Sequence, residues 1–129
     1  MQDFSITITP RFYETDAIGH INNASIAAWL EVVRMGFIAS LRGSQQNSAQ
    51  ADNWILASLQ IDFVAETFFG VDVIGRVTEA KAGNSSLTVL CELSQGEKLT
   101  VKARAVLVFM DLQTRRPARL PDALRVQLA

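Results

Sequence analysis

The segment from Ala24 to Leu41 restricts the fold most, because its side chains are apolar on nearly every side of a helix. One side carries apolar residues at helical spacing, and others extend around it: Ile26, Leu30, Val33, Phe37 and Leu41, then Trp29, Val32, Met35 and Ile38. Such a helix must be buried over most of its circumference. In a chain of 129 residues, that burial requires a sheet wrapped around the helix. Gly43 is the expected stop at its C-terminus.

Alternating apolar and polar residues predict strands before and after this helix. The first covers residues 4–12 and contains Pro10, which favours an edge strand or a bulge. A polar surface loop at 44–53 precedes four further predicted strands, at 54–63, 71–81, 86–94 and 98–111. In the first of these four, one face is expected to carry Ile55, Ala57, Leu59, Ile61 and Phe63.

Turn sequences at 82–85 and 94–97 join the last three predicted strands as hairpins. Asp122 is the expected cap of a short terminal helix. The order of one strand, a long helix and four hairpin-connected strands predicts an α+β fold with an antiparallel sheet. Residues 1–129 are expected to form a single domain.

The end of the last predicted strand indicates a second subunit. Val106, Val108 and Met110 make it apolar on the face opposite Leu107 and Phe109. A strand that is apolar on both faces is normally covered on both, and the one long helix can cover only one of them. The expected second cover is another copy of the chain, which predicts a homodimer.

Composition excludes several classes of partner. The 12 Lys and Arg residues nearly balance the 13 Asp and Glu residues, so no broad positive field attracts nucleic acid or an anionic membrane. The long helix is interrupted by Glu31 and Arg34, which argues against a membrane span. The N-terminus lacks a secretory pattern, and the single Cys91 is expected to be a small core residue. A cytoplasmic protein is therefore expected.

The loop before the helix holds the residues that suggest chemistry. It contains a carboxylate at Asp16, the permissive Gly19 and the only imidazole, His20. Asn22 or Asn23 is the expected N-cap of the helix, whose N-terminus directs partial positive charge at the loop. Asp16 is either a structural turn residue or a partly desolvated nucleophile or general base, with Ile18 and Ile21 providing apolar surroundings.

His20 has three possible roles: a structural loop residue, a polar group that orients substrate, or a metal ligand together with Asp16. No second His and no nearby Cys complete a metal site, so no metal is expected. The sequence also has no phosphate-binding glycine loop, dinucleotide fingerprint or serine nucleophile elbow, and no cofactor is expected. Glu31 and Arg34 are three residues apart and are predicted to form a structural ion pair on the helix.

The loop and helix together resemble the active-site region of hotdog-fold acyl-CoA thioesterases of the 4-hydroxybenzoyl-CoA thioesterase type. The resemblance lies in Tyr13-Glu-Thr-Asp-Ala-Ile-Gly-His-Ile-Asn-Asn23, followed by Trp29, Glu31 and Arg34. It continues in the segments 60–63, 83–86, 106–111 and 120–122, and so covers most of the chain. It implies the hotdog fold, in which a five-stranded antiparallel sheet is wrapped around one long central helix, paired as a dimer and often a dimer of dimers.

The resemblance also implies an activity, the hydrolysis of acyl-CoA thioesters to free carboxylic acid and coenzyme A. Asp16 would be the catalytic carboxylate and the backbone N–H of Asn23 would polarise the thioester carbonyl, with His20 beside them. Substrate would be bound by five residues in two places, Gly19 and Asn22 in the loop and Gly83, Asn84 and Ser85 in the hairpin turn near coenzyme A.

Two other functions of the hotdog fold compete with hydrolysis. Hydratases and dehydratases of acyl thioesters usually space their Asp and His by five, with an Asn and a Pro between, whereas Asp16 and His20 are four apart with neither. A noncatalytic acyl-CoA-binding or regulatory module is the other alternative, because a fold does not determine a function. Such a sensor would not need Asp16.

Overall fold

The computed structural model describes residues 3–42 and 53–128. Its strands are β1 (Phe4–Ile8), β2 (Trp54–Phe63), β3 (Val73–Ala82), β4 (Ser86–Gln95), β5 (Lys98–Asp111) and β6 (Arg116–Pro117). Its helices are α1 (Asn23–Arg42), α2 (Asp122–Leu128) and the 3-10 turn η1 (Phe12–Glu14). The strands form one antiparallel sheet in the order β1-β3-β4-β5-β2, to which the two-residue β6 adds beside β5. The predicted α+β fold is confirmed.

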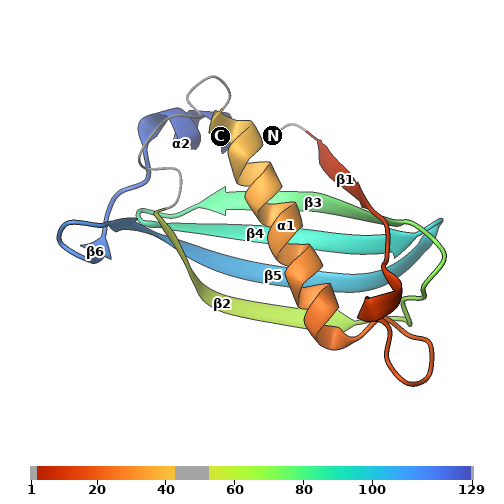
Figure 1. Cartoon of the computed structure of the whole chain (residues 1–129). Coiled ribbons are helices and arrows are strands. Elements are labelled where there is room, and N and C mark those ends of the chain that lie inside the picture. Colours follow the sequence, from red (N-terminus) through yellow and green to blue (C-terminus); the bar gives the residue numbers. More distant parts are fainter. Residues whose placement is uncertain (1–2, 43–52, 129) are drawn as a thin grey trace.

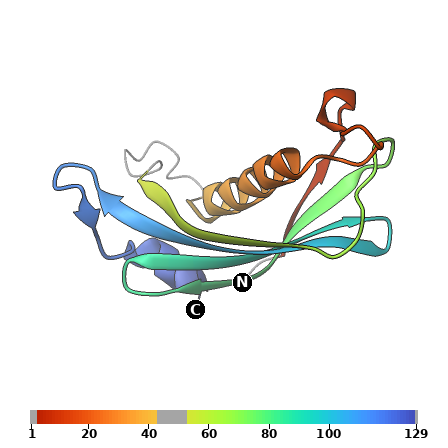
Figure 2. The ribbon, with the colours of Figure 1, turned by 90° about the horizontal axis from the view of Figure 1, so that it is seen from below.

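The sheet curves beneath α1, which crosses its concave face (Figures 1 and 2). The core between them consists of aliphatic and aromatic side chains at most 7% exposed, including Leu30, Val33, Phe37, Val89 and Leu93. Gly75 of β3 allows the closest approach, because a Cβ there would lie 2.5 Å from Cγ2 of Val33. By length and composition α1 could cross a membrane, but in this fold it is the helix on which the core is built.

The side of α1 that faces away from the sheet is not covered by any described residue. We name this surface the outer stripe; it comprises Ala24, Ala28, Glu31 and Val32. Val32 is 57% exposed, although its apolar side chain led us to expect burial. The predicted burial of the helix is therefore correct for the side that faces the sheet and wrong for the outer stripe.

The predicted end of the first strand differs from the structure. β1 is an edge strand, as Pro10 indicated, but it ends at Ile8. The apolar alternation continues to Phe12, yet that residue lies in η1 and is 75% exposed. The predicted helix stop at Gly43 and nearly all of the predicted loop at 44–53 lie outside the described residues. α2 begins at Asp122. The carbonyl of the preceding Pro121 accepts hydrogen bonds from the N–H groups of Leu124 and Arg125.

β2 contains an irregularity that changes the predicted faces. Its register with β5 shifts between Leu56 and Ser58, which leaves Ala57 as the extra residue of a bulge. Because a bulge reverses the alternation, Ile55 lies on the opposite face from Leu59, Ile61 and Phe63. The prediction that all five residues share one face is wrong at Ile55, and Ala57 has no partner in the ladder. β2 is also the long open edge of the sheet, with Ile55 49% and Phe63 48% exposed.

Candidate active site

The loop between η1 and α1 is closed by its own backbone and by the Asp16 side chain. The Asp16 N–H donates to the His20 carbonyl at 2.7 Å. Asp16 Oδ1 accepts hydrogen bonds from the N–H groups of Ile18 and His20, each at 3.0 Å. Gly19 has a φ of +86°, a backbone conformation that residues with a Cβ rarely adopt. One carboxylate oxygen is therefore used to hold the loop, and no described donor bonds to the other.

Asp16 is exposed in the single chain, contrary to the expected partial desolvation. Of the two isoleucines predicted to surround it, Ile21 is turned into the core at 4% exposure and Ile18 is turned to solvent at 73%. The reason is a backbone bridge between Thr15 and Ile21, which directs the second isoleucine inward. Any desolvation of the carboxylate must come from a substrate or another subunit.

Asn22 is the N-cap of α1, one of the two residues predicted for that role. Its Oδ1 accepts from the N–H of Ser25 at 2.7 Å, and its Nδ2 donates to the carbonyl of Glu14 at 2.8 Å. Asn23 is the first helical residue and is exposed. Its N–H is one of those that a helix cannot satisfy internally, and no described acceptor receives it. The helix N-terminus thus presents a free donor next to the Asp16 loop.

Glu14 fixes the loop to the helix, a role that sequence reasoning missed. One carboxylate oxygen accepts from the Arg11 N–H at 2.7 Å and the other accepts from Trp29 Nε1 at 2.8 Å. The Glu14 carbonyl also receives the N–H of Asn22 at 2.8 Å. The sequence indicates this role only weakly, because Glu14 and Trp29 come into contact only when α1 folds back over η1.

His20 is held by residues that the sequence did not single out. Its Nε2 lies 3.3 Å from Glu66 Oε2, and its ring meets Phe68 edge-on at a centroid distance of 5.2 Å. The backbones of His20 and Phe68 also form an isolated bridge. Gln95, at the end of β4, anchors this segment by donating to the carbonyls of Phe68 and Val71. Only the tertiary fold brings Glu66 and Phe68 to the loop.

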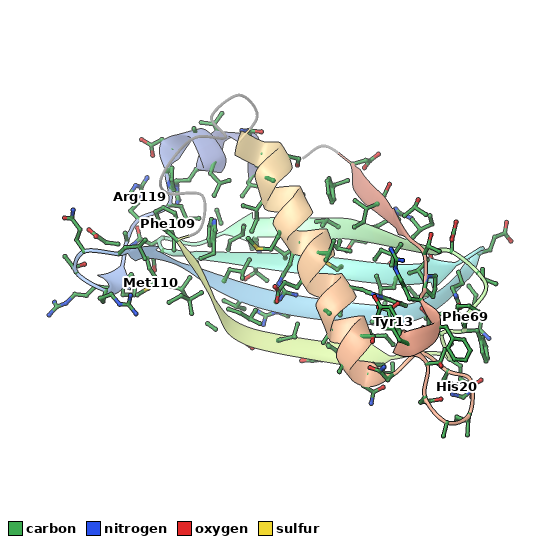
Figure 3. The ribbon with its side chains drawn as sticks, viewed as in Figure 1. Tyr13, His20, Phe69, Phe109, Met110 and Arg119 are labelled. Carbon is green, nitrogen blue, oxygen red and sulfur yellow. The ribbon has the colours of Figure 1, made fainter. Side chains whose placement is uncertain are left out.

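Exposed aromatic side chains surround the same end of the molecule. We name this group the aromatic rim; it comprises Phe12, Tyr13, Phe68 and Phe69, which are 41–78% exposed. Phe12 and Phe69 meet edge-on at 5.9 Å, and Tyr13, Phe69 and His20 lie together in Figure 3. Exposed aromatic residues in such a group mark a surface that binds a partner or ligand.

The predicted substrate-binding turn lies at the other end of the sheet. Gly83, Asn84 and Ser85 connect β3 to β4, and the Ser85 carbonyl accepts from the N–H of Phe109 at 2.8 Å. Phe109 is at the end of the molecule opposite His20 (Figure 3). The structure therefore unites Asp16, Gly19, His20, Asn22 and Asn23 in one place but does not bring the turn to them within one chain.

The predicted ion pair between Glu31 and Arg34 does not form. Glu31 is exposed, whereas Arg34 is only 3% exposed, and the described ion pairs within 4.0 Å do not include it. Arg34 Nε is buried without a hydrogen-bond acceptor. Burial lowers the pKa of the Arg34 guanidinium, while the nearby Glu31 and Cys91 act in the opposite direction. Cys91 is a buried core residue, as predicted.

Neither a metal cluster nor a described cavity offers another site. Within 3–42 and 53–128, no three His, Cys, Asp or Glu side chains are grouped to hold a metal ion. A hollow of about 520 Å³ lies between β3 and α2, and one of about 250 Å³ lies on the convex face of the sheet around Leu90 and Arg104. Both are lined by residues outside the segment from η1 to the start of α1.

Residues 10–128 match the family model of the thioesterase-like superfamily. The chain belongs to this superfamily. The resemblance to hotdog-fold thioesterases is thereby confirmed, and thioester hydrolysis is the general activity that membership supports.

Solved structures and a curated relative agree with this assignment. A predicted thioesterase from Bacillus stearothermophilus is 32% identical, with a TM-score of 0.88 over 98% of this chain and 94% of that chain. A thioesterase from Thermus thermophilus, complexed with coenzyme A and zinc, is 24% identical, with a TM-score of 0.83 over 96% and 90% of the two chains, and shows likeness of fold. The uncharacterized protein YsmA of Bacillus subtilis (strain 168) is 30% identical over 92 residues, which are 70% of this chain and 61% of YsmA. That match spans less than two thirds of YsmA.

Proposed function

We propose that this thioesterase-superfamily chain hydrolyses acyl-CoA thioesters to a free carboxylic acid and coenzyme A. The proposal rests on the arrangement of polar groups at the start of α1. There, a carboxylate with one uncommitted oxygen, at Asp16, shares a short, closed loop with the free backbone donor of Asn23. The coenzyme A bound by the Thermus thioesterase supports the choice of a coenzyme A thioester as substrate.

In the proposed reaction, the thioester carbonyl oxygen accepts a hydrogen bond from the Asn23 N–H. Negative charge develops on that oxygen, where the positive end of the α1 dipole stabilises it. Asp16 then acts by one of two routes. As a nucleophile, it bonds to the acyl carbon, expels the coenzyme A thiolate and is released by water; as a general base, it takes a proton from the water that attacks. The thiolate leaves without strong acid assistance in either case.

His20 is proposed to orient the substrate rather than to bind a metal. Glu66 holds one ring nitrogen at 3.3 Å, and Phe68 packs against the ring, so the imidazole has a fixed position beside the loop. The aromatic rim provides apolar surface next to it for the pantetheine or acyl part of the substrate. Gly19 and Asn22 keep their proposed role because they shape the loop that receives the carbonyl group.

A homodimer completes the proposed site. β2 is an open edge of ten residues with apolar side chains exposed on both faces, and an edge of this kind is a template for pairing with another strand. A two-fold axis that pairs β2 with its copy reverses the second chain. The reversed chain turns its Gly83–Ser85 end toward the Asp16 loop of the first, which would bring the predicted coenzyme A turn into the site.

Steady-state hydrolysis of a panel of acyl-CoAs with different acyl groups tests the proposal, with free thiol release as the readout. We expect at least one member to be hydrolysed, and formation of no hydrated product from an enoyl-CoA member. Binding of acyl-CoAs without hydrolysis of any would contradict the proposal and support the noncatalytic binding module. Hydration of the enoyl-CoA member without hydrolysis would support the hydratase alternative.

A further inference from the structure

Glu66 lies beside the candidate site and contacts it through His20. Its Oε2 lies 3.3 Å from His20 Nε2, and the two side chains are 59% and 24% exposed, respectively. Contacts between exposed charged side chains usually contribute little, because both side chains must be held in one geometry. The contact can therefore have a role only if the rest of the fold holds the two side chains in place.

Backbone hydrogen bonds hold the segment that carries Glu66. The Val64 N–H donates to the Thr100 carbonyl at 2.9 Å, and the Thr67 carbonyl accepts from the Ile21 N–H at 2.9 Å. Thr67 is itself buried, with 3% of its surface exposed. Glu66 therefore lies between two fixed points of the backbone, one joined to β5 and the other joined to the segment that leads into α1.

Phe68 fixes the orientation of the His20 ring. The two rings meet edge-on at a centroid distance of 5.2 Å, and the two backbones form an isolated bridge. Phe68 is held in turn by the Gln95 side chain, which accepts from the Phe68 N–H at 3.0 Å and donates to the Phe68 carbonyl at 2.8 Å. The imidazole thus has one neighbour that packs against the ring and another that binds a single ring nitrogen.

The chemistry of this contact determines which ring nitrogen of His20 carries the proton. An ionised carboxylate only accepts hydrogen bonds, so a hydrogen bond to Glu66 requires the proton on Nε2. In a neutral imidazole the other nitrogen, Nδ1, is then an acceptor. Without such a partner, a neutral imidazole exchanges between its two tautomers. Glu66 therefore makes Nδ1 the nitrogen that accepts a hydrogen bond from a bound molecule.

An acceptor at this place restricts which part of a coenzyme A thioester His20 can bind. The carbonyl oxygen and the sulfur of the thioester have no proton to donate, and the carbonyl oxygen is already assigned to the Asn23 N–H. The first donor beyond the sulfur is the amide N–H of the pantetheine arm, which two methylene groups separate from the sulfur. The exposed aromatic rim beside His20 (Figure 3) offers apolar surface to those methylene groups.

We propose that Glu66 is a positioning residue that holds His20 in the tautomer protonated on Nε2, so that Nδ1 accepts a hydrogen bond from the first amide N–H of the pantetheine arm. The inference rests on the proposed hydrolysis of acyl-CoA and names the part of the substrate that His20 binds. Glu66 acts through His20 and does not itself touch the substrate.

Nitrogen-15 NMR of the imidazole tests the tautomer without substrate. His20 is the only histidine, so protein made without a histidine tag gives one pair of ring signals. At alkaline pH, where imidazoles are neutral, we expect wild type to show only the form protonated on Nε2 and Glu66→Ala to show a mixture of both forms. Glu97→Ala, at an exposed carboxylate of the β4–β5 turn, is the matched control and should give the wild-type spectrum. A wild-type ring protonated on Nδ1, or a Glu66→Ala spectrum identical to that of wild type, would overturn the inference.

Steady-state kinetics test the contact with the amide. Two thioesters of one acyl group are compared: a thioester of N-acetylcysteamine, which keeps the pantetheine amide N–H, and a thioester of an alkane thiol of the same length, which lacks it. Glu66→Ala should raise KM for the first by about three- to tenfold, the loss expected for one hydrogen bond. We expect kcat to stay unchanged, because the contact is the same in the ground state and the transition state. KM for the alkane thioester should stay at the wild-type value, and equal increases for both thioesters would contradict the amide contact.

A double variant shows whether Glu66 acts through the imidazole. His20→Ala should raise KM for the N-acetylcysteamine thioester at least as much as Glu66→Ala does, and the double variant should show no further increase. Increases that multiply in the double variant would mean that Glu66 acts independently of His20, which would refute the positioning role. The NMR measurement uses no substrate, so failure of the tautomer assignment is distinguishable from failure of the proposed hydrolysis.

Discussion

At the scale of single residues, Asn22 determines where the free donor of the site lies. Its side chain caps α1 through Ser25 and also holds the Glu14 carbonyl, so one amide connects the helix, the loop and η1. The adjacent Asn23 N–H has its position fixed by these two hydrogen bonds. The geometry of the proposed oxyanion site therefore depends on a residue whose side chain does not touch the oxyanion.

Asn22→Ala removes both hydrogen bonds and should reduce the free energy of unfolding. The cap contributes about 1 kcal/mol and the bond to the Glu14 carbonyl about 1 kcal/mol more. Asn22→Ser is the matched control, because serine keeps the cap but is too short to replace the second bond; its loss should be about half as large. Urea unfolding measures both, and an Asn22→Ala protein as stable as wild type would contradict the assignment of the cap.

Cys91 gives a prediction for alkaline pH. Burial raises the pKa of its thiol to about 11 from a reference of 9.0, with Arg34 acting in the opposite direction. The thiol stays protonated in the folded protein while it ionises in the unfolded chain, so its contribution to stability is complete below pH 9.0 and is lost as pH rises through about 11.

The free energy of unfolding should accordingly fall between these pH values by more in wild type than in Cys91→Ala. Ultraviolet absorbance of the thiolate provides an independent check. A folded protein whose thiolate signal appears with a midpoint below pH 9 would show that burial does not control this group.

At the scale of elements, the contact of α1 with β3 depends on a missing side chain. A Cβ at Gly75 would lie 2.5 Å from Val33 Cγ2 and 3.3 Å from Leu93 Cδ2, so the helix can lie this close to the sheet only because β3 has a glycine there. Closer packing leaves fewer gaps between α1 and the strands below it.

Gly75→Ala should destabilise the fold by about 1–3 kcal/mol, the usual cost of overpacking a core. Val33→Ala removes the clashing methyl groups and has its own cavity cost. The double variant should lose less than the sum of the two single losses, because the two residues occupy the same space. Strictly additive losses in thermal or urea unfolding would show that the helix shifts away instead.

The elements that sequence predicted well are those with local signals. β5 has the predicted bounds, and β4 and β3 differ from them by two residues or fewer at each end, because alternation and turn residues mark them. β1 was predicted too long because Phe12 continues the alternation after the backbone has turned into η1. The bulge at Ala57 was missed because the pairing with β5, and not the local sequence, produces it.

The residues of the candidate site also differ in how well the sequence predicted them. Asp16, Gly19, His20 and Asn22 are close in sequence and were found together. Glu66 and the aromatic residues beside it lie in the segment between β2 and β3, which the tertiary fold brings to the loop. No local sequence pattern predicts that contact. The same limit applies to Arg34, whose burial without an acceptor depends on the whole arrangement of α1 over the sheet.

At the scale of the whole molecule, one side of the fold is left uncovered in a single chain. The edge strand β2, the uncovered concave face and the outer stripe of α1 all remain open. Their apolar exposure is an aggregation hazard in a monomer. The two halves of the predicted substrate site also lie at opposite ends of the sheet (Figure 3), which an antiparallel pair of chains would correct.

Wild-type protein should therefore be a dimer or a larger even assembly at micromolar concentration. Multi-angle light scattering coupled to size exclusion measures the mass directly, and the chain mass of 14.2 kDa gives the reference. A species at the mass of one chain that persists at these concentrations would refute the homodimer, but would leave the hydrolysis proposal to its own test.

Asp16→Asn tests most directly whether the Asp16 carboxylate performs the hydrolysis. Asparagine retains the Oδ1 that accepts from Ile18 and His20, so the loop should keep its shape while the charge is lost. Asp72→Asn, at another exposed aspartate, which bonds Thr9, is the matched control. The measurement is turnover of the best acyl-CoA substrate, with its binding followed separately by calorimetry.

Asp16→Asn should lower turnover by about 10²- to 10⁴-fold, the usual cost of removing a general base, or by more if Asp16 is the nucleophile. Acyl-CoA binding should stay within a few-fold of wild type, and Asp72→Asn should hydrolyse at the wild-type rate. An Asp16→Asn protein that turns over its best substrate at near the wild-type rate would contradict the assignment of Asp16.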